Sequence, residues 1–164
     1  MALTPEDRQK LIQRYADGPR LLRQALDRVP KEARRWRPAP GKWSVHEVIC
    51  HCADSETNAA IRIRYVLAER SPTIVGYDQD AWADALDYES HPVEPALAAV
   101  EAARANTVPL LKRLPEAAWA RQGTHTESGK YSAEDWLRLY AEHLEVHARQ
   151  IQRNFAAWQA KDTA

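Results

Sequence analysis

The sequence lacks the features that mark several large classes of protein. Its 164 residues include only two cysteines and five glycines, and 23 Lys+Arg are balanced by 23 Asp+Glu. The two cysteines, Cys50 and Cys52, are too few and too close together for a disulfide framework. Without an excess of positive charge, counterion release would not drive binding to nucleic acids. We therefore expect no disulfide-stabilised fold and no nucleic-acid partner.

Long apolar runs are also missing. No run approaches the roughly 20 residues that a membrane-spanning helix needs. Near the amino terminus, Thr4 and Pro5 are typical of a helix start and not of a secretory signal. We therefore expect a cytoplasmic protein without membrane contact, folded as a single domain over residues 1–164.

The residues that are frequent, Ala, Leu, Arg and Glu, favour helices. No stretch shows the clean period-two alternation of a strand. Four long helices are expected, at about 5–29, 44–70, 93–114 and 132–160. The long connection from 71 to 92 is expected to hold a short helix near 79–86. This pattern predicts an all-α four-helix bundle.

Local signals mark the starts and interruptions of these helices. Ser44 with Glu47, and Ser132 with Asp135, form two capping boxes. Pro19 is expected to kink or interrupt the first helix, because proline cannot donate to the helical ladder.

Two histidines lie where the last helix should bury its apolar side. The residues at spacings of three and four are Trp136, Tyr140, His143, His147, Ile151, Phe155 and Trp158. Two imidazoles one turn apart on a buried face need polar partners, because burying unpaired polar groups is costly. A metal ion would satisfy both. Hydrogen bonds to backbone or water would do so too, and the two readings remain open at this point.

The second helix carries a polar ribbon beside its apolar stripe. At about 100° per residue, His51 falls on the flank of the stripe. Glu47, Asp54, Ser55, Asn58 and Arg62 share its side. This ribbon is either a solvated edge or the lining of an internal cavity.

Two known metal-binding motifs are incomplete or absent in the sequence. His46-Glu47-x-x-Cys50 fails the zincin pattern, because cysteine replaces the second histidine. The Glu-x-x-His pair of di-iron bundles is absent. What survives is His51 on one helix with His143 and His147 on another. Three neutral imidazoles with an open position are typical of a catalytic metal site, and zinc, nickel, copper and iron all accept imidazole.

The order of these motifs resembles the DinB/YfiT-like superfamily of metal-dependent enzymes. The residues that carry the likeness run from Arg37-Pro38-Ala-Pro40-Gly41-Lys42-Trp43-Ser44 into Glu47-x-x-x-His51-x-x-Asp54-x-Glu56, then His125-Thr-Glu-Ser-Gly129, then His143-x-x-x-His147-x-x-Gln150-Ile151. Any one piece is weak, but their order is specific. Cys52 departs from the usual apolar residue at its position, which should not disturb the site.

The resemblance implies a four-helix bundle in the order 1-2-4-3, counting the long helices along the chain. It also implies a divalent metal, nickel or zinc, on His51, His143 and His147, and frequent homodimers. Some members resemble S-transferases that use a low-molecular-weight thiol. The tryptophans Trp82, Trp119 and Trp158 near expected helix ends also favour a homodimer.

Two kinds of function follow. The first is a metalloenzyme acting on a small molecule, in which the metal activates water for hydrolysis or a thiol cosubstrate for S-transfer. In it, Asp54 and Glu47 are candidate acid/base groups, and Asn58 and Arg62 are candidates for holding an anionic substrate. All four have an equally simple role as surface residues. The alternative is a non-catalytic metal-binding or stress-linked protein, which a closed fourth coordination position would favour.

Overall fold

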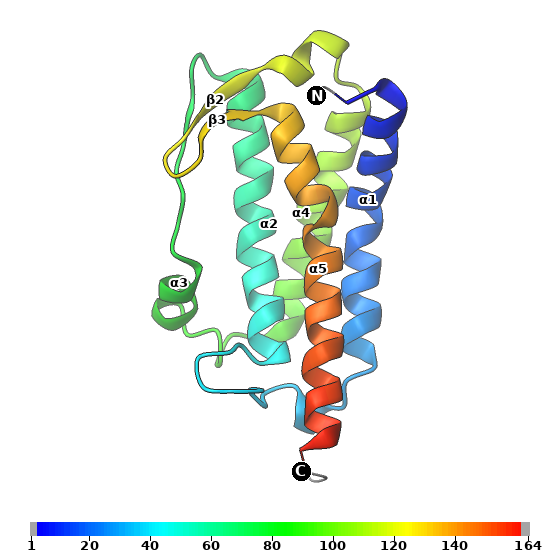
Figure 1. Ribbon diagram of the computed structural model, residues 1–164, viewed down its shortest axis with the longest axis vertical. Helices are drawn as coiled ribbons and strands as arrows, with labels where there is room; N and C mark the ends of the chain where they lie inside the picture. The colour runs from blue at the N-terminus through cyan, green and yellow to red at the C-terminus, as the bar shows by residue number, and fades with distance from the viewer. Residues whose placement is uncertain (1–2, 162–164) are drawn as a thin grey trace.

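Four long helices stand side by side in the computed structural model, which describes residues 3–161 (Figure 1). They are α1 (Pro5–Asp27), α2 (Val45–Ala68), α4 (Val93–Lys112) and α5 (Ala133–Ala160). The connections hold the short helix α3 (Gln79–Ala85), single 3₁₀ turns at Lys31–Ala33 and Glu116–Ala120, and the strands β1 (Thr73–Ile74), β2 (Gln122–His125) and β3 (Gly129–Ser132). The expected four-helix bundle is thus confirmed.

The helix starts follow the local signals in the sequence. The side chain of Ser44 accepts a hydrogen bond from the backbone of Glu47, whose carboxylate accepts one in return, and Ser132 and Asp135 do the same for α5. Such pairs satisfy backbone N–H groups that a helix start would leave free. The expected interruption at Pro19 is wrong, because α1 continues through it.

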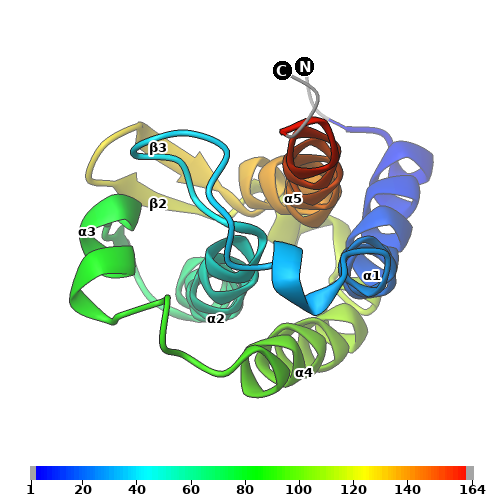
Figure 2. The same ribbon diagram turned by 90° about the horizontal axis from the view of Figure 1, so that it is seen from below.

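The order of the helices around the bundle corrects one expectation. Seen end on, α5 lies between α1 and α2, and α4 closes the ring on the other side (Figure 2). Counted as four long helices along the chain, the order is 1-4-2-3 and not 1-2-4-3. The first and second helices therefore lie diagonally, because residues 28–44 cross the end of the bundle instead of making a tight turn.

The expected all-α class is confirmed, but a small three-stranded sheet in the connections was not predicted from the sequence. β2 pairs with β3 in an antiparallel hairpin and with β1 in parallel. Between residues 3 and 161 no strand exceeds four residues, so none there is long enough to show alternation in the sequence. The sheet lies beside the amino-terminal end of α5, and the β2–β3 hairpin extends from there outward past α2 (Figure 1).

Two groups of buried apolar side chains fill the bundle along its length. Trp119 belongs to one of them and is only 4% exposed, so it serves the chain's own core and is not available to a partner. The homodimer therefore stays a prediction, and Trp119 no longer supports it. Within residues 3–161, every helix is too short or too polar to cross a lipid bilayer.

Candidate metal centre

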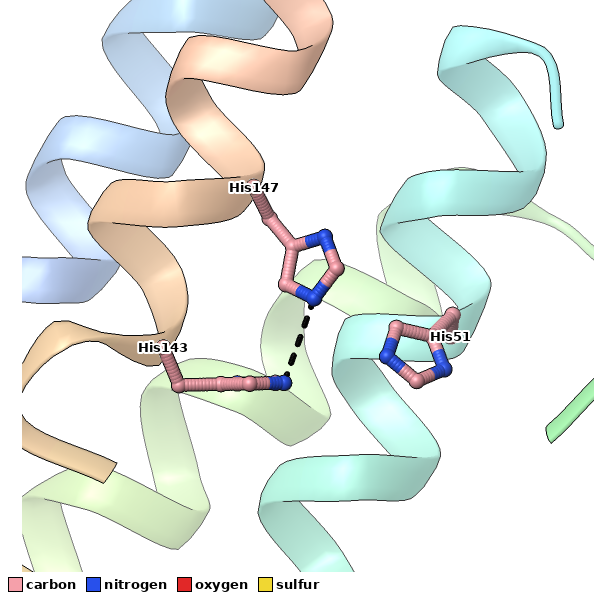
Figure 3. Close-up of side chains that lie close together, drawn as sticks. All are labelled: His51, His143 and His147. Carbon is pink, nitrogen blue, oxygen red and sulfur yellow. Dashed lines mark hydrogen bonds between the residues drawn. The ribbon is translucent and has the colours of Figure 1, made fainter. Parts of the chain in front are cut away.

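Three histidines from two helices converge beside the core (Figure 3). His51 projects from α2, and His143 and His147 project from α5 one turn apart. One ring nitrogen from each lies within 4.8 Å of those of the other two, and the Nε2 atoms of His143 and His147 are 3.2 Å apart. In the part of the chain that the structure describes, no other group of three His, Cys, Asp or Glu side chains is close enough to share an ion.

The Nδ1 atoms of the two α5 histidines, His143 and His147, form hydrogen bonds with oxygen acceptors. Nδ1 of His143 lies 2.9 Å from Oε1 of Glu56, and Nδ1 of His147 lies 2.8 Å from Oε1 of Gln150. An ionised carboxylate and an amide oxygen only accept, so each Nδ1 carries the hydrogen. In neutral rings, both Nε2 lone pairs then face each other across 3.2 Å. A metal ion would resolve this repulsion, since tetrahedral Zn–N bonds of about 2.0–2.1 Å hold two nitrogens about 3.3–3.4 Å apart.

Burial keeps two of the rings neutral. Burial first, and then repulsion from His147 and His143, lowers the pKa of His51 to about 3. Burial and the proximity of His143 lower the pKa of His147 to about 4, against the opposing effect of its hydrogen bond to Gln150. Neutral imidazole is the form that binds metals. At neutral pH these side chains therefore offer lone pairs to a cation.

His51 is almost completely buried against Trp43, with 4.7 Å between the ring centroids. Its Nδ1 atom is buried and has no hydrogen-bond partner among the described residues. No protein group therefore fixes the tautomer of this ring, which is free to present an unprotonated nitrogen to the other histidines. The three residues together fit a divalent metal ion.

Glu56 accepts a hydrogen bond from His143 and is itself paired with Arg104. Neither Glu56 nor Arg104 was given a role from the sequence. Glu56 is fully buried, and Arg104 of α4 donates to both of its oxygens, at 2.6 and 2.8 Å. Burial would raise the pKa of Glu56, but Arg104 and the hydrogen bond to His143 outweigh it and the net shift is downward. Carboxylates in this position commonly orient metal-binding histidines. The sequence feature that could have indicated this role is the position of Glu56 within the apolar stripe of the second helix.

The burial of the histidines reverses the sequence expectation. His51, expected on the flank of its stripe, is buried, whereas His143 and His147 are only half-buried. Leu144 and Ala148 take the interior positions of α5 instead. The reason is that α5 packs more extensively on α1 than on α2, so its buried stripe turns toward α1 and leaves the histidines at the α2 margin.

A cleft of about 250 Å³ opens onto the three histidines. Its walls include Gly76 and Tyr77 from the segment before α3, and His125 and Glu127 from the hairpin. These segments are distant in sequence, and only the fold brings them to the histidines. One side of the cluster thus faces a space for a small molecule, and no fourth ligand from the described residues closes it.

The two candidate acid/base residues lie outside the lining of this cleft. Glu47 is buried at the start of α2, where its carboxylate accepts from the backbone of Ser44 and pairs with Arg37. Asp54 accepts a hydrogen bond from the hydroxyl of Tyr88 at 2.5 Å. Both carboxylates are therefore engaged in holding the fold, and nothing in the geometry adds to their proposed catalytic role.

The two candidate substrate-binding residues differ from each other. The amide of Asn58 donates to the backbone carbonyl of Asp54 within its own helix. Arg62 lines the cleft, where it donates to the hydroxyl of Tyr140 at 3.1 Å and to the carbonyl of Val75 at 2.6 Å. Of the four candidate acid/base and substrate-binding residues, Arg62 alone lines the cleft, and Ser55 of the same ribbon lines it too.

Comparison with known proteins places this arrangement in a family. A chain from Oceanobacillus iheyensis, named as a candidate metal-dependent hydrolase, is 34% identical over 140 residues, covering 85% of this chain and 81% of its own. YfiT from Bacillus subtilis, named in the same way, is 28% identical over 151 residues, covering 92% and 85%.

A solved structure of Bacillus subtilis YfiT, whose fold is described as an unusual four-helix bundle topology, superposes with a TM-score of 0.86. It has 27% sequence identity and covers 93% of this chain and 88% of that one. The family model of the DinB superfamily matches residues 14–151, which include all three histidines. With this match over most of its length and a relative above 30% identity, the chain belongs to the DinB superfamily.

Proposed function

We propose that this protein is a metal-dependent hydrolase of small molecules, with His51, His143 and His147 holding a divalent ion, nickel or zinc. The observation that carries the proposal is the pair of Nε2 atoms 3.2 Å apart, because both Nδ1 atoms are committed to oxygen acceptors. Two lone pairs that face each other in a half-buried site repel each other, and a bound cation would offset this repulsion.

The open side of the cluster favours catalysis over a purely structural metal. Structural sites complete their coordination with protein ligands, whereas catalytic sites keep one position free. Here only three candidate ligands gather among residues 3–161, and the cleft reaches them. This open side supports an enzyme over a non-catalytic metal-binding protein.

A divalent ion in such a site supplies Lewis-acid activation, bringing the pKa of a bound water or thiol toward neutrality. The chain's own contribution is positional. Glu56 and Gln150 fix the tautomers of His143 and His147, and burial keeps His51 and His147 unprotonated. The hydroxyl of Ser55 lies 3.3 Å from Nε2 of His143, at the edge of the cleft, within reach of a group bound there.

Hydrolysis is preferred over thiol transfer because the relatives found by comparison are named as candidate hydrolases. Transfer to a low-molecular-weight thiol stays a prediction from the family resemblance. An activity screen separates the two: esters and amides are offered with and without a small thiol, and monochlorobimane serves as the electrophile for transfer. Turnover that needs no thiol supports the hydrolase, and turnover that occurs only with thiol contradicts it.

Metal analysis of untagged protein tests the site itself. The wild type is expected to hold about one equivalent of divalent metal, and His147→Ala is expected to lose it. His125→Ala is the matched control, because His125 lines the same cleft but stands outside the cluster. Equal metal content in wild type and His147→Ala would refute the assignment.

A further inference from the structure

The wall of the histidine cleft carries one permanently charged cation, Arg62. No other lysine or arginine among the described residues lines it. The guanidinium lies over the ring of Tyr77, 5.6 Å from its centroid, and it donates hydrogen bonds to two neutral oxygens, the Tyr140 hydroxyl and the Val75 carbonyl. A cation partly withdrawn from water with only neutral acceptors is incompletely compensated.

The hydrogen-bonding capacity of Arg62 is also incompletely used. A guanidinium has five N–H donors, and two are taken by Tyr140 and Val75. Its Nε atom is buried and has no partner in the described structure. By contrast, Arg104 and Arg37 donate two hydrogen bonds to buried carboxylates. Arg62 has the same fork of donors, but among the described residues it pairs with no carboxylate.

The distance from Arg62 to the histidines suits a short molecule. Nη1 of Arg62 is 3.1 Å from the Tyr140 hydroxyl, and the Tyr140 ring centroid is 5.6 Å from that of His143. One tyrosine side chain thus separates the guanidinium from the cluster. The cleft volume of about 250 Å³ is below the range of about 300–1,000 Å³ typical of drug-sized ligands.

The charge of the cleft favours an anion. Three neutral imidazoles would leave the charge of a divalent ion uncompensated, and Arg62 adds one more positive charge. Glu56 does not offset this, because it is paired with Arg104. The one carboxylate in the lining is the exposed Glu127. A concave site with an excess of positive charge attracts anionic ligands.

We propose that Arg62 is a specificity residue that binds a carboxylate at one end of a small substrate while the bond to be cleaved lies at the three histidines. This inference rests on the proposed hydrolase function and names its substrate class: short acyl compounds with a free carboxylate. Bidentate pairing with a carboxylate would use the donors that the fold leaves free.

A series of matched acids and amides tests the inference. N-acetylglycine, N-butyrylglycine and N-benzoylglycine are compared with the corresponding glycinamides, which have the same shape and no charge. Calorimetric binding to zinc-loaded protein is expected to favour the acid in at least one pair by about tenfold or more. Equal affinity for acid and amide in every pair, absence of binding included, overturns the inference.

Variants assign the preference to Arg62 rather than to the metal, which also attracts carboxylates. Arg62→Gln is expected to reduce the acid-to-amide preference about tenfold at unchanged metal content. Arg64→Gln is the matched control: Arg64 is equally half-buried on the same helix but contacts Ala60 and Thr107 away from the cleft. If both variants keep the wild-type preference, or both lose it, the inference is wrong.

A further variant is needed because Arg62→Gln also loses the hydrogen bond to the Val75 carbonyl, and this loss could by itself unfold the protein. Arg62→Lys retains the positive charge without the forked guanidinium donors, and it is expected to keep part of the acid-to-amide preference. If Arg62→Gln is unfolded and Arg62→Lys keeps the full wild-type preference, bidentate binding by Arg62 is contradicted. The two proposals fail separately. Loss of the acid preference with intact metal-dependent hydrolysis refutes only the role of Arg62. An acid preference without any metal-dependent hydrolysis refutes only the hydrolase.

Discussion

Glu56 and His143 form a hydrogen bond of 2.9 Å between Oε1 and Nδ1, which joins a fully buried carboxylate to a half-buried imidazole. The same carboxylate receives two hydrogen bonds from Arg104, which also donates to the backbone carbonyls of Tyr15 and Tyr140. One residue from the diagonally placed α4 thereby fixes the orientation of a metal-binding candidate on α5. The site and the core are thus parts of one polar network.

Removing Arg104 should destabilise the fold strongly. Arg104→Met leaves Glu56 buried without its cation, and breaking a buried pair in this way costs about 3–5 kcal/mol. Urea unfolding of chelator-treated protein measures it. The control is Arg14→Met, which removes partly exposed ion pairs with Glu142 and Glu145 and should cost about 1 kcal/mol or less. Similar losses in both variants would contradict this account of Arg104.

Asp54 should matter less for metal binding than any histidine of the cluster. Its carboxylate is engaged by Tyr88 and lies outside the three-residue group. Asp54→Asn is therefore expected to keep the wild-type metal content, whereas His51→Ala loses most of it. Metal analysis of the two purified variants gives the answer. Equal loss in both would make Asp54 a ligand and the three-histidine assignment wrong.

The two cysteines should be dispensable for activity. Burial raises the pKa of the Cys50 thiol to about 12, and it also raises the pKa of the fully buried Cys52 thiol well above its ordinary value. A thiol that stays protonated is a poor nucleophile. We expect hydrolysis to vanish with a chelator, to return with zinc or nickel, and to survive Cys50→Ser and Cys52→Ala. Activity lost in a folded, metal-loaded cysteine variant would instead indicate covalent cysteine chemistry.

The metal-free protein should lose stability on mild acidification. The unfolded chain protonates His51 near its ordinary pKa of 6.5, whereas the folded chain resists protonation down to about 3. Since the unfolded state then binds more protons, the free energy of unfolding falls as pH falls below 6.5. Between pH 6.5 and pH 5 the loss from His51 alone is about 2 kcal/mol. Urea unfolding at several pH values measures the slope, which should be shallower in His51→Gln; an unchanged slope would contradict the burial argument.

Much of the local structure could be predicted because its causes are local. The capping boxes at Ser44 and Ser132 mark helix starts through contacts only three residues apart. The spacing of His143 and His147 puts both rings on one side of α5 whatever that helix packs against. The short strands escaped prediction, since Gln122–His125 gains its partners from Thr73–Ile74 and Gly129–Ser132 and not from its own pattern.

The sequence by itself determined four helices, their starts and three histidines on two of them. The tertiary structure alone decided that α5 lies between α1 and α2, which turns Leu144 inward and leaves His143 at the margin. It also joined Glu56 to Arg104 and brought Arg62 to the cleft. The physical reason is that helical periodicity fixes which residues share a face, whereas the neighbour of that face depends on packing between segments distant in the chain.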